Sequence, residues 1–166
     1  MHMNDLQDLF KEDLKDVLNA ENQIAKALPK MIKAATHDEL RAAFESHLEE
    51  TKEQINRLEQ VMGMVGMPVK GKTCKAMKGL LEEGKEVMEE DATDDVMDAA
   101  LIGAAQKVEH YEIATYGTLC TYAELLGLRD AKRLLGQTLD EEKATDQKLT
   151  DLAESLINLE AAQGEQ

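Results

Sequence analysis

The chain has 166 residues, of which 34 are acidic and 19 basic, so its formal charge is −15. This charge argues against nucleic acid and anionic membrane surfaces as partners, because both attract clustered lysine and arginine. With 43% hydrophobic residues, 2 prolines and no tryptophan, the composition favours one helical domain over a disordered chain or a turn-rich β fold. No apolar run approaches the roughly 18 residues of a membrane span. We therefore expect a single-domain cytoplasmic protein over residues 1–166.

Two local features of the sequence fit this expectation. The start, Met1–Met3, has the form of a cloning remnant ahead of a native start at Met3, so His2 is excluded from the site. Cys74 and Cys120 are isolated in the sequence, which is typical of reduced thiols in a reducing compartment.

The first half of the chain predicts a helical hairpin. Apolar residues three or four apart indicate a first helix over about residues 4–35. Pro29 should kink this helix or end its regular part, because proline lacks the backbone N–H and its ring clashes with the preceding turn. A second helix is predicted over about residues 39–65, with Thr36 or Asp38 as its N-cap.

The second half predicts a connection and another hairpin. Residues 66–93 differ in character and hold one short amphipathic segment followed by an acidic run. A third long helix is expected over about residues 94–126 and a fourth over 130–162, with Gly127 ending the third. Two antiparallel hairpins joined by a long crossover with a short extra helix define an all-α four-helix bundle.

Each of the four predicted helices carries carboxylates on its apolar stripe, where leucine would be expected. Charged side chains are rarely buried unless they are paired or bound to metal, and spacings of three or four residues place such pairs on one helix face. In chain order the candidates are Glu21, then His47 with Glu50, then Glu109 with Glu112, and finally Glu142 with Asp146.

These candidates fall at similar depths in the predicted bundle. Glu21 lies 16 residues before the expected turn at His37, and Glu50 lies 13 residues after it. In the second hairpin, Glu112 and Glu142 lie 16 residues before and 14 after the turn at residue 128. Any single one of these residues can be a solvated edge position, because acidic residues are common in this chain. Their coincidence on four helices favours a buried cluster.

Such a cluster needs counter-charges. Two carboxylates about 4 Å apart repel by about 4 kcal/mol at an effective dielectric constant of about 20, so protons or divalent cations must neutralise them. Carboxylates with one or two imidazoles suit iron or manganese better than the thiolate-rich ligand sets of structural zinc. The sequence therefore predicts a two-metal site in the bundle core.

Several segments carry a recognisable pattern, namely Ala20–Gln23, Ala27–Met31, Phe44–Thr51, Ala105–Ala114 and Leu139–Lys143. With these segments the chain resembles the YciE/YciF family of ferritin-like bacterial stress proteins over about residues 4–160. The resemblance implies a ferritin-like bundle, a homodimer and a di-metal centre, in a family without a settled reaction. By position, it implies as metal ligands Glu21, His47, Glu50, Glu109, Glu112 and Glu142, with Asp146 as a weaker candidate.

The ligand pattern departs from that of most di-iron bundles, which use a lone Glu from two helices and Glu-x-x-His from the other two. Here the second helix has His47-x-x-Glu50 in the reverse order, and the fourth has Thr145 where a histidine would follow Glu142. The third helix has Glu-x-x-Glu. The site should therefore be richer in oxygen ligands and poorer in nitrogen ligands.

Three functions remain open at this point. The first is redox chemistry on iron, oxygen or peroxide at two divalent ions, with iron preferred and manganese as the alternative. The second is a metal-stabilised, non-catalytic dimer that acts as a structural or partner-binding stress protein, and the third is a storage cage. Tyr116, four residues after Glu112, either donates a hydrogen bond to a ligand carboxylate or packs in the core. His110 is expected at the surface or at a dimer contact.

Overall fold

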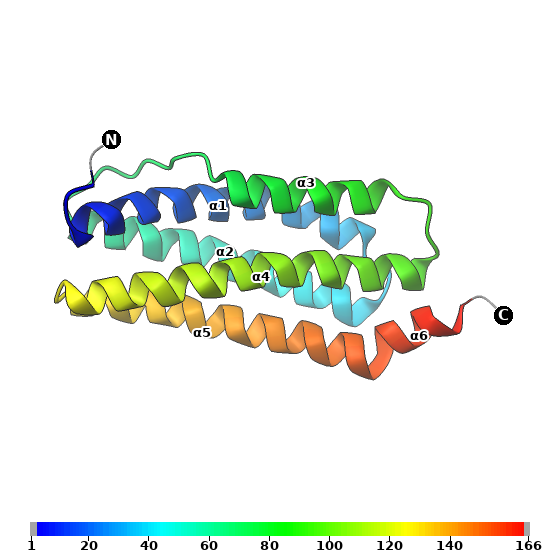
Figure 1. Cartoon of the computed structure of the whole chain (residues 1–166). Coiled ribbons are helices and arrows are strands. Elements are labelled where there is room, and N and C mark those ends of the chain that lie inside the picture. Colours follow the sequence, from blue (N-terminus) through cyan, green and yellow to red (C-terminus); the bar gives the residue numbers. More distant parts are fainter. Residues whose placement is uncertain (1–2, 165–166) are drawn as a thin grey trace.

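The computed structural model describes residues 3–164, and this part of the chain is helical without strands (Figure 1). The expected cloning remnant at Met1 and His2 lies outside the described residues, whereas Met3 lies within them. The helices are α1 (Leu6–Ala34), α2 (Asp38–Met64), α3 (Lys75–Glu89), α4 (Asp94–Leu125), α5 (Arg129–Leu152) and α6 (Asn158–Gln163), with a π-helical turn, η1, at Ala153–Ile157. Among these helices, none is both long and apolar enough to span a membrane.

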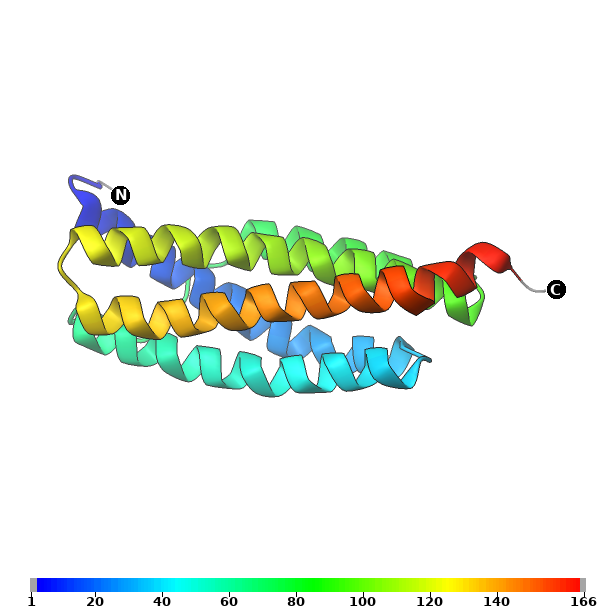
Figure 2. The same cartoon turned by 90° about the horizontal axis from the view of Figure 1, so that it is seen from below.

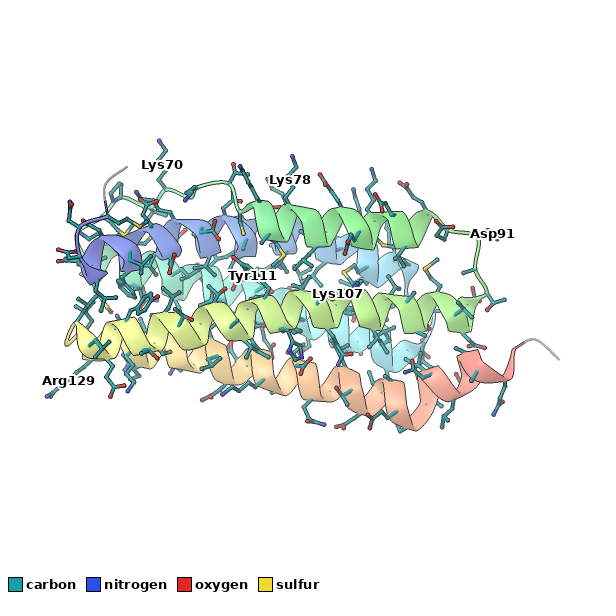
Figure 3. The ribbon with its side chains drawn as sticks, viewed as in Figure 1. Lys70, Lys78, Asp91, Lys107, Tyr111 and Arg129 are labelled. Carbon is teal, nitrogen blue, oxygen red and sulfur yellow. The ribbon has the colours of Figure 1, made fainter. Side chains whose placement is uncertain are left out.

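The four long helices form a bundle in which each packs on two neighbours, α1 on α2 and α4, and α5 on α2 and α4. All neighbouring long helices run antiparallel (Figures 1 and 2). The crossover after α2 returns along α1, and α3 then packs outside the bundle against α1 and α4 (Figure 1). Charged side chains such as Lys78 on α3 point away from the bundle (Figure 3).

The ends of α1 follow local chemistry with one exception. The side chain of Asp5 accepts a hydrogen bond from the backbone N–H of Asp8 at 2.9 Å, which caps the N-terminus. Of the two effects expected of Pro29, a kink or an end of the regular helix, the second is wrong, because α1 continues through Pro29 to Ala34. The proline removes one backbone hydrogen bond, while the buried side chains of Leu28 and Met31 hold this part of the helix against the core.

The turn between α1 and α2 is fixed by a residue of α4. The N-cap of α2 is His37, whose Nδ1 accepts from the N–H of Glu39 at 3.3 Å, and not Thr36 or Asp38 as predicted. Thr36 instead donates its N–H and its hydroxyl to the carboxylate of Asp98, each at 2.8 Å, and His37 donates its N–H to the same carboxylate at 2.8 Å. Asp98 is only 2% exposed.

The remaining helix ends also show one difference from the prediction. α2 and α4 end before Gly66 and Gly127, whose φ angles of 66° and 72° favour glycine. The fourth helix, expected without interruption over residues 130–162, contains the π-helical turn η1. This wider turn places Ala153 and Ile157 against the core and leaves Leu159 exposed.

The core consists of two apolar clusters with a polar layer between them. One cluster lies toward the α1–α2 turn and includes Leu28, Phe44, Ile102 and Leu149, all buried. The other lies toward the α4–α5 turn and comprises buried residues that include Phe10, Leu14, Leu58, Leu119 and Leu135. On every long helix, buried polar residues lie at the border between these two clusters, among them Glu21, Thr51, Glu112 and Glu142, whereas Glu12 and Asp98 lie outside this layer. The polar layer contains the predicted site.

Candidate metal centre

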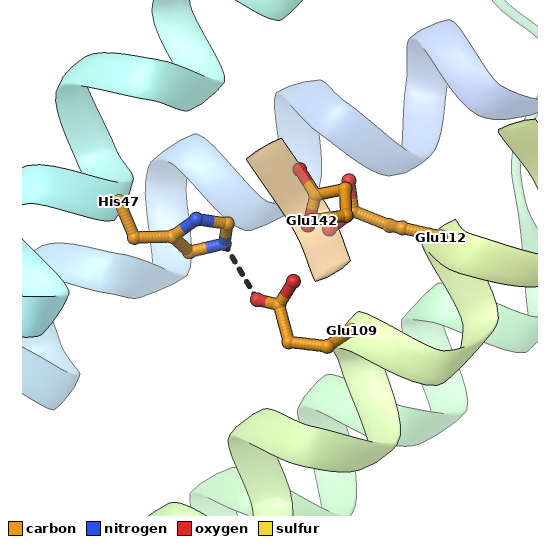
Figure 4. A group of neighbouring side chains, drawn as sticks. All are labelled: His47, Glu109, Glu112 and Glu142. Atoms are coloured by element: carbon orange, nitrogen blue, oxygen red, sulfur yellow. Dashed lines mark ion pairs between the residues drawn. The ribbon is translucent and has the colours of Figure 1, made fainter. Parts of the chain in front are cut away.

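Four predicted ligands from three helices meet in the polar layer. They are His47 of α2, Glu109 and Glu112 of α4, and Glu142 of α5, and their side chains point toward one another (Figure 4). One ligand atom of each lies within 4.8 Å of the others. All four residues are buried, and none is more than 4% exposed. The positions come from the helical repeat, since Glu109 and Glu112 are three residues apart and project from one face of α4.

Glu21 adds a fifth buried side chain from α1. It is fully buried, and its Oε1 accepts a hydrogen bond from the hydroxyl of Tyr116 at 2.5 Å. Tyr116 therefore holds a predicted ligand, the first of the two roles that the sequence left open. The charge of Glu21 also acts on Glu112, whose pKa it helps to raise. Glu21 nevertheless lies outside the group of four whose ligand atoms are within 4.8 Å of one another.

Glu50 lies at the edge of this group. Its side chain is 37% exposed, and its Oε2 lies 3.8 Å from Nδ1 of His47. The hydroxyl of Thr145 on α5 donates to the same oxygen at 3.3 Å. Glu50, Ser46 and Lys148 line a surface pocket that reaches His47, named here the polar mouth. Glu50 is thus placed where a ligand could meet solvent.

Asp146 is not among the side chains brought together. Its Oδ2 lies 3.2 Å from Nε2 of His110, and its Oδ1 accepts from Nε2 of Gln106 at 3.4 Å. The side chain of His110 is 69% exposed, which agrees with its expected surface position. Asp146 therefore contributes to the outer part of the contact between α4 and α5.

The group has many unpaired oxygens. Counting partners among residues 3–164, six buried carboxylate oxygens accept no hydrogen bond: Oε2 of Glu21, Oε2 of Glu109, and both oxygens of Glu112 and of Glu142. A buried carboxylate without a partner costs several kcal/mol, about 3 or more. His47 offers one cationic neighbour, with its Nε2 2.9 Å from Oε1 of Glu109. A set of many carboxylate oxygens and one imidazole fits a divalent cation that prefers oxygen ligands.

The protonation of the group follows from its burial. Burial raises the pKa of Glu112 well above its ordinary value, and the charges of Glu21 and Glu142 raise it further. Burial likewise raises the pKa of Glu21 and of Glu142. For His47, burial alone would lower the pKa, but the carboxylate of Glu109 raises it well above the ordinary value. Without a cation this layer retains protons, which a metal ion would have to displace.

Sequence reasoning missed the polar residues beside the group. Gln54 and Thr138 are buried, and Arg57 donates to both carboxylate oxygens of Glu141 at 2.7 Å. Arg57 also donates to the hydroxyl of Thr138 at 3.2 Å, which links α2 to α5. The sequence does contain an indication that Gln54 is buried, because Gln54 follows His47 by seven residues and therefore lies on the same helical stripe.

The fold and the site define a helical bundle with a buried histidine–glutamate group. The chain belongs to the family described as Domain of unknown function (DUF892), which matches residues 5–162. It is 51% identical over 162 residues to protein YciF of Escherichia coli K12, and the aligned region covers 97% of this chain and 98% of YciF. The family resemblance predicted from the sequence is confirmed.

Two solved structures extend the comparison. The crystal structure of the E. coli stress protein YciF matches with a TM-score of 0.90 at 52% identity, covering 94% of this chain and 99% of YciF. YcfI from Rhodopseudomonas palustris, for which a structural role has been suggested, matches with a TM-score of 0.86 at 48% identity, covering 89% of this chain and 94% of YcfI. The helical bundle is therefore shared with both relatives.

Proposed function

We propose that this protein is a ferritin-like, di-metal-binding stress-response protein with redox activity on iron, dioxygen or peroxide. The observation that carries the proposal is the set of six buried carboxylate oxygens that have no hydrogen-bond partner within residues 3–164 and lie beside one imidazole. Cations would remove the cost of burying these charges. The similarity to the stress protein YciF supports the stress-response role.

The side chains divide into those that would bind metal and those that would assist. The central ligands would be the four side chains that meet in the polar layer, His47, Glu109, Glu112 and Glu142. Glu21 and Glu50 would complete the coordination. Iron is preferred and manganese is the alternative, because oxygen ligands with imidazole suit both. Bound iron or manganese supplies one-electron chemistry toward dioxygen or peroxide.

The protein itself would orient ligands and exclude water. The hydroxyl of Tyr116 would hold the carboxylate of Glu21 in place through Oε1, which leaves Oε2 without a partner among residues 3–164. The apolar clusters on both sides of the polar layer exclude bulk water, which strengthens electrostatic interactions inside it. The polar mouth at Glu50 would give ions and small polar oxidants access to His47.

The test is the metal content of the protein and of one matched pair of variants. Protein purified without chelator or a nickel column should hold about two iron or manganese ions per chain by plasma mass spectrometry. Glu112→Gln keeps the shape of the side chain and should lose metal, whereas Glu59→Gln, at an exposed position on α2, should retain it. Absence of metal after purification and after anaerobic reconstitution would refute the proposal.

A second candidate, a non-catalytic dimeric structural protein, is favoured by the suggested structural role of the relative YcfI. Both candidates predict metal loss in Glu112→Gln. Only the first predicts that wild-type protein turns over ferrous ion with peroxide and that the variant does not. We propose a homodimer in either case, and light scattering on a size-exclusion column would distinguish it from a larger storage cage.

A further inference from the structure

An apolar chamber adjoins the candidate metal centre on the side of the α1–α2 turn. It has about 20 Å³ of free volume, and ten of its thirteen lining residues are apolar. The principal walls come from all four long helices and include Ile24, Leu28, Phe44, Ala105, Val108 and Leu149. A cavity that holds one water molecule needs about 10–15 Å³, so the chamber has room for one very small molecule.

The chamber offers a polar guest little to bind. Three polar residues, His47, Glu109 and Thr145, line it. Oε2 of Glu109 and the ring nitrogens of His47 have no hydrogen-bond partner among residues 3–164, but they are buried, and the surface that the chamber presents to a guest is almost entirely apolar. The hydroxyl of Thr145 donates to Glu50. A buried water normally requires two to four polar partners, whereas apolar cavities stay dry and bind xenon or small hydrocarbons. The chamber therefore favours an apolar guest.

His47 separates this chamber from the polar mouth. The two spaces share Ala43, His47 and Thr145 as lining residues, but the polar mouth adds Ser46, Glu50 and Lys148 in place of the apolar walls. Ions and polar oxidants have suitable partners in the polar mouth. Only a guest that needs no hydrogen bonds gains by leaving water for the chamber.

We propose that this chamber is a binding site for a small apolar gas of the dioxygen class, held beside His47 and Glu109. Its use as an oxidant site rests on the proposed function, whereas gas binding itself requires no metal. Hydrogen peroxide, which needs hydrogen-bond partners, is not a guest of the chamber. Dioxygen would then be the oxidant that reaches the centre from the apolar side.

The proposal can be tested on the metal-free full chain by methyl NMR under dioxygen and, separately, under xenon. Dioxygen is paramagnetic and broadens nearby methyl signals, and xenon shifts them. Saturable effects are expected at Ile24, Leu28 and Leu149, while methyls of the other core cluster, such as Leu58 and Leu119, serve as internal controls. Equal effects in both clusters, or none in either, would overturn the proposal.

Two variants give an independent check. Ala105→Leu fills the chamber from α4 and should abolish the gas effects at Leu149, whereas Ala114→Leu, at an exposed position on the same helix, should leave them unchanged. If Ala105→Leu does not fold, Ala27→Leu fills the chamber from its half-buried outer wall. Persistence of the gas effects in a folded, filled variant would contradict the assignment.

These outcomes are separable from those of the proposed function. Gas binding in a protein that takes up no metal would support the chamber and refute the metal centre. Metal uptake in a protein whose chamber methyls do not respond to either gas would refute the chamber and support the metal centre. Neither result depends on turnover.

Discussion

Glu112 shows how a single buried carboxylate can oppose folding until a cation binds. Both of its oxygens lack hydrogen-bond partners among the described residues, and burial raises its pKa well above the ordinary value. In the metal-free protein near neutral pH, folding must therefore keep an unpaired charge or take up a proton. Either alternative costs free energy relative to the unfolded chain, in which the carboxylate is hydrated.

Replacing Glu112 by Gln should consequently change stability in opposite directions with and without metal. The metal-free variant should be more stable than wild type by about 1–3 kcal/mol, because the amide carries no charge. The rise in Tm caused by iron or manganese should disappear. Urea unfolding of chelated protein and melting with metal measure the two effects. The control Glu59→Gln should change the free energy of unfolding, with or without metal, by less than about 0.5 kcal/mol. A metal-free Glu112→Gln protein that is less stable than wild type would contradict this prediction.

Tyr116 permits a similar test of ligand positioning. Tyr116→Phe removes the hydrogen bond to Glu21 and leaves both carboxylate oxygens of Glu21 unpaired. The free energy of unfolding of the metal-free protein should fall by about 1–3 kcal/mol. Tyr122→Phe is the matched control, because Tyr122 is half-buried and packs against the same apolar cluster as Tyr116. Equal losses in chemical denaturation of the two variants would refute this role of Tyr116.

At the scale of elements, Asp98 connects the two hairpins away from the metal centre. Its buried carboxylate accepts three hydrogen bonds from the α1–α2 turn. Asp98→Ala should lower the free energy of unfolding by about 2–4 kcal/mol, because three donors lose a charged partner. Asp95→Ala, one turn earlier on the exposed side of α4, should cost less than about 1 kcal/mol. Urea titrations in which the two variants behaved alike would show that the turn does not depend on Asp98.

The elements themselves were largely predictable from the sequence, and the exceptions have physical causes. Apolar spacing and glycine positions determine where long helices run and where α2 and α4 end. Thr36 was mistaken for a cap because its partner, Asp98, lies 62 residues away. The π-helical turn at Ala153–Ile157 was missed because one extra residue per turn barely alters an apolar repeat.

The site was predictable only as far as helix faces and depth determine it. Glu112 and Glu142 lie on the centre of their apolar stripes, and the structure buries both completely. Asp146 follows Glu142 by four residues and shares its face, but a slightly different angle brings it to His110 at the contact between α4 and α5. Spacing alone does not separate these two directions. The same limit applies to Glu50, which lies at the polar mouth.

For the whole molecule, the buried group should make stability depend on pH in a specific direction. Burial raises the folded-state pKa of Glu21, Glu112 and Glu142 above the ordinary value of 4.5, and Glu109 raises that of His47 above 6.5. Each of these groups binds protons more tightly in the folded state. Their contribution to stability is therefore fully present below the ordinary pKa and is lost as the pH rises through the folded-state pKa.

Chelated protein should accordingly be less stable near pH 8 than near pH 5. Bound metal should stabilise the folded protein more strongly near pH 8, because fewer protons compete for the ligands there. Urea unfolding at the two pH values, with chelator or with manganese, measures both trends. In chelated protein, the free energy of unfolding should depend less steeply on pH in Glu112→Gln than in wild type, whereas Glu59→Gln should keep the wild-type dependence. This comparison distinguishes the effect of the site from the effect of the net charge of −15. Stability independent of pH in the chelated wild type would contradict the raised pKa values.

The proposed ligands are divided between the two hairpins: α1 and α2 carry Glu21, His47 and Glu50, and α4 and α5 carry the other glutamates. A bound cation would therefore join the two halves of the chain, and protons would take its place on the carboxylates when it leaves. The helix α3 packs on both α1 and α4 and so lies across the seam between these halves. By these contacts α3 would keep the two halves together in the metal-free protein.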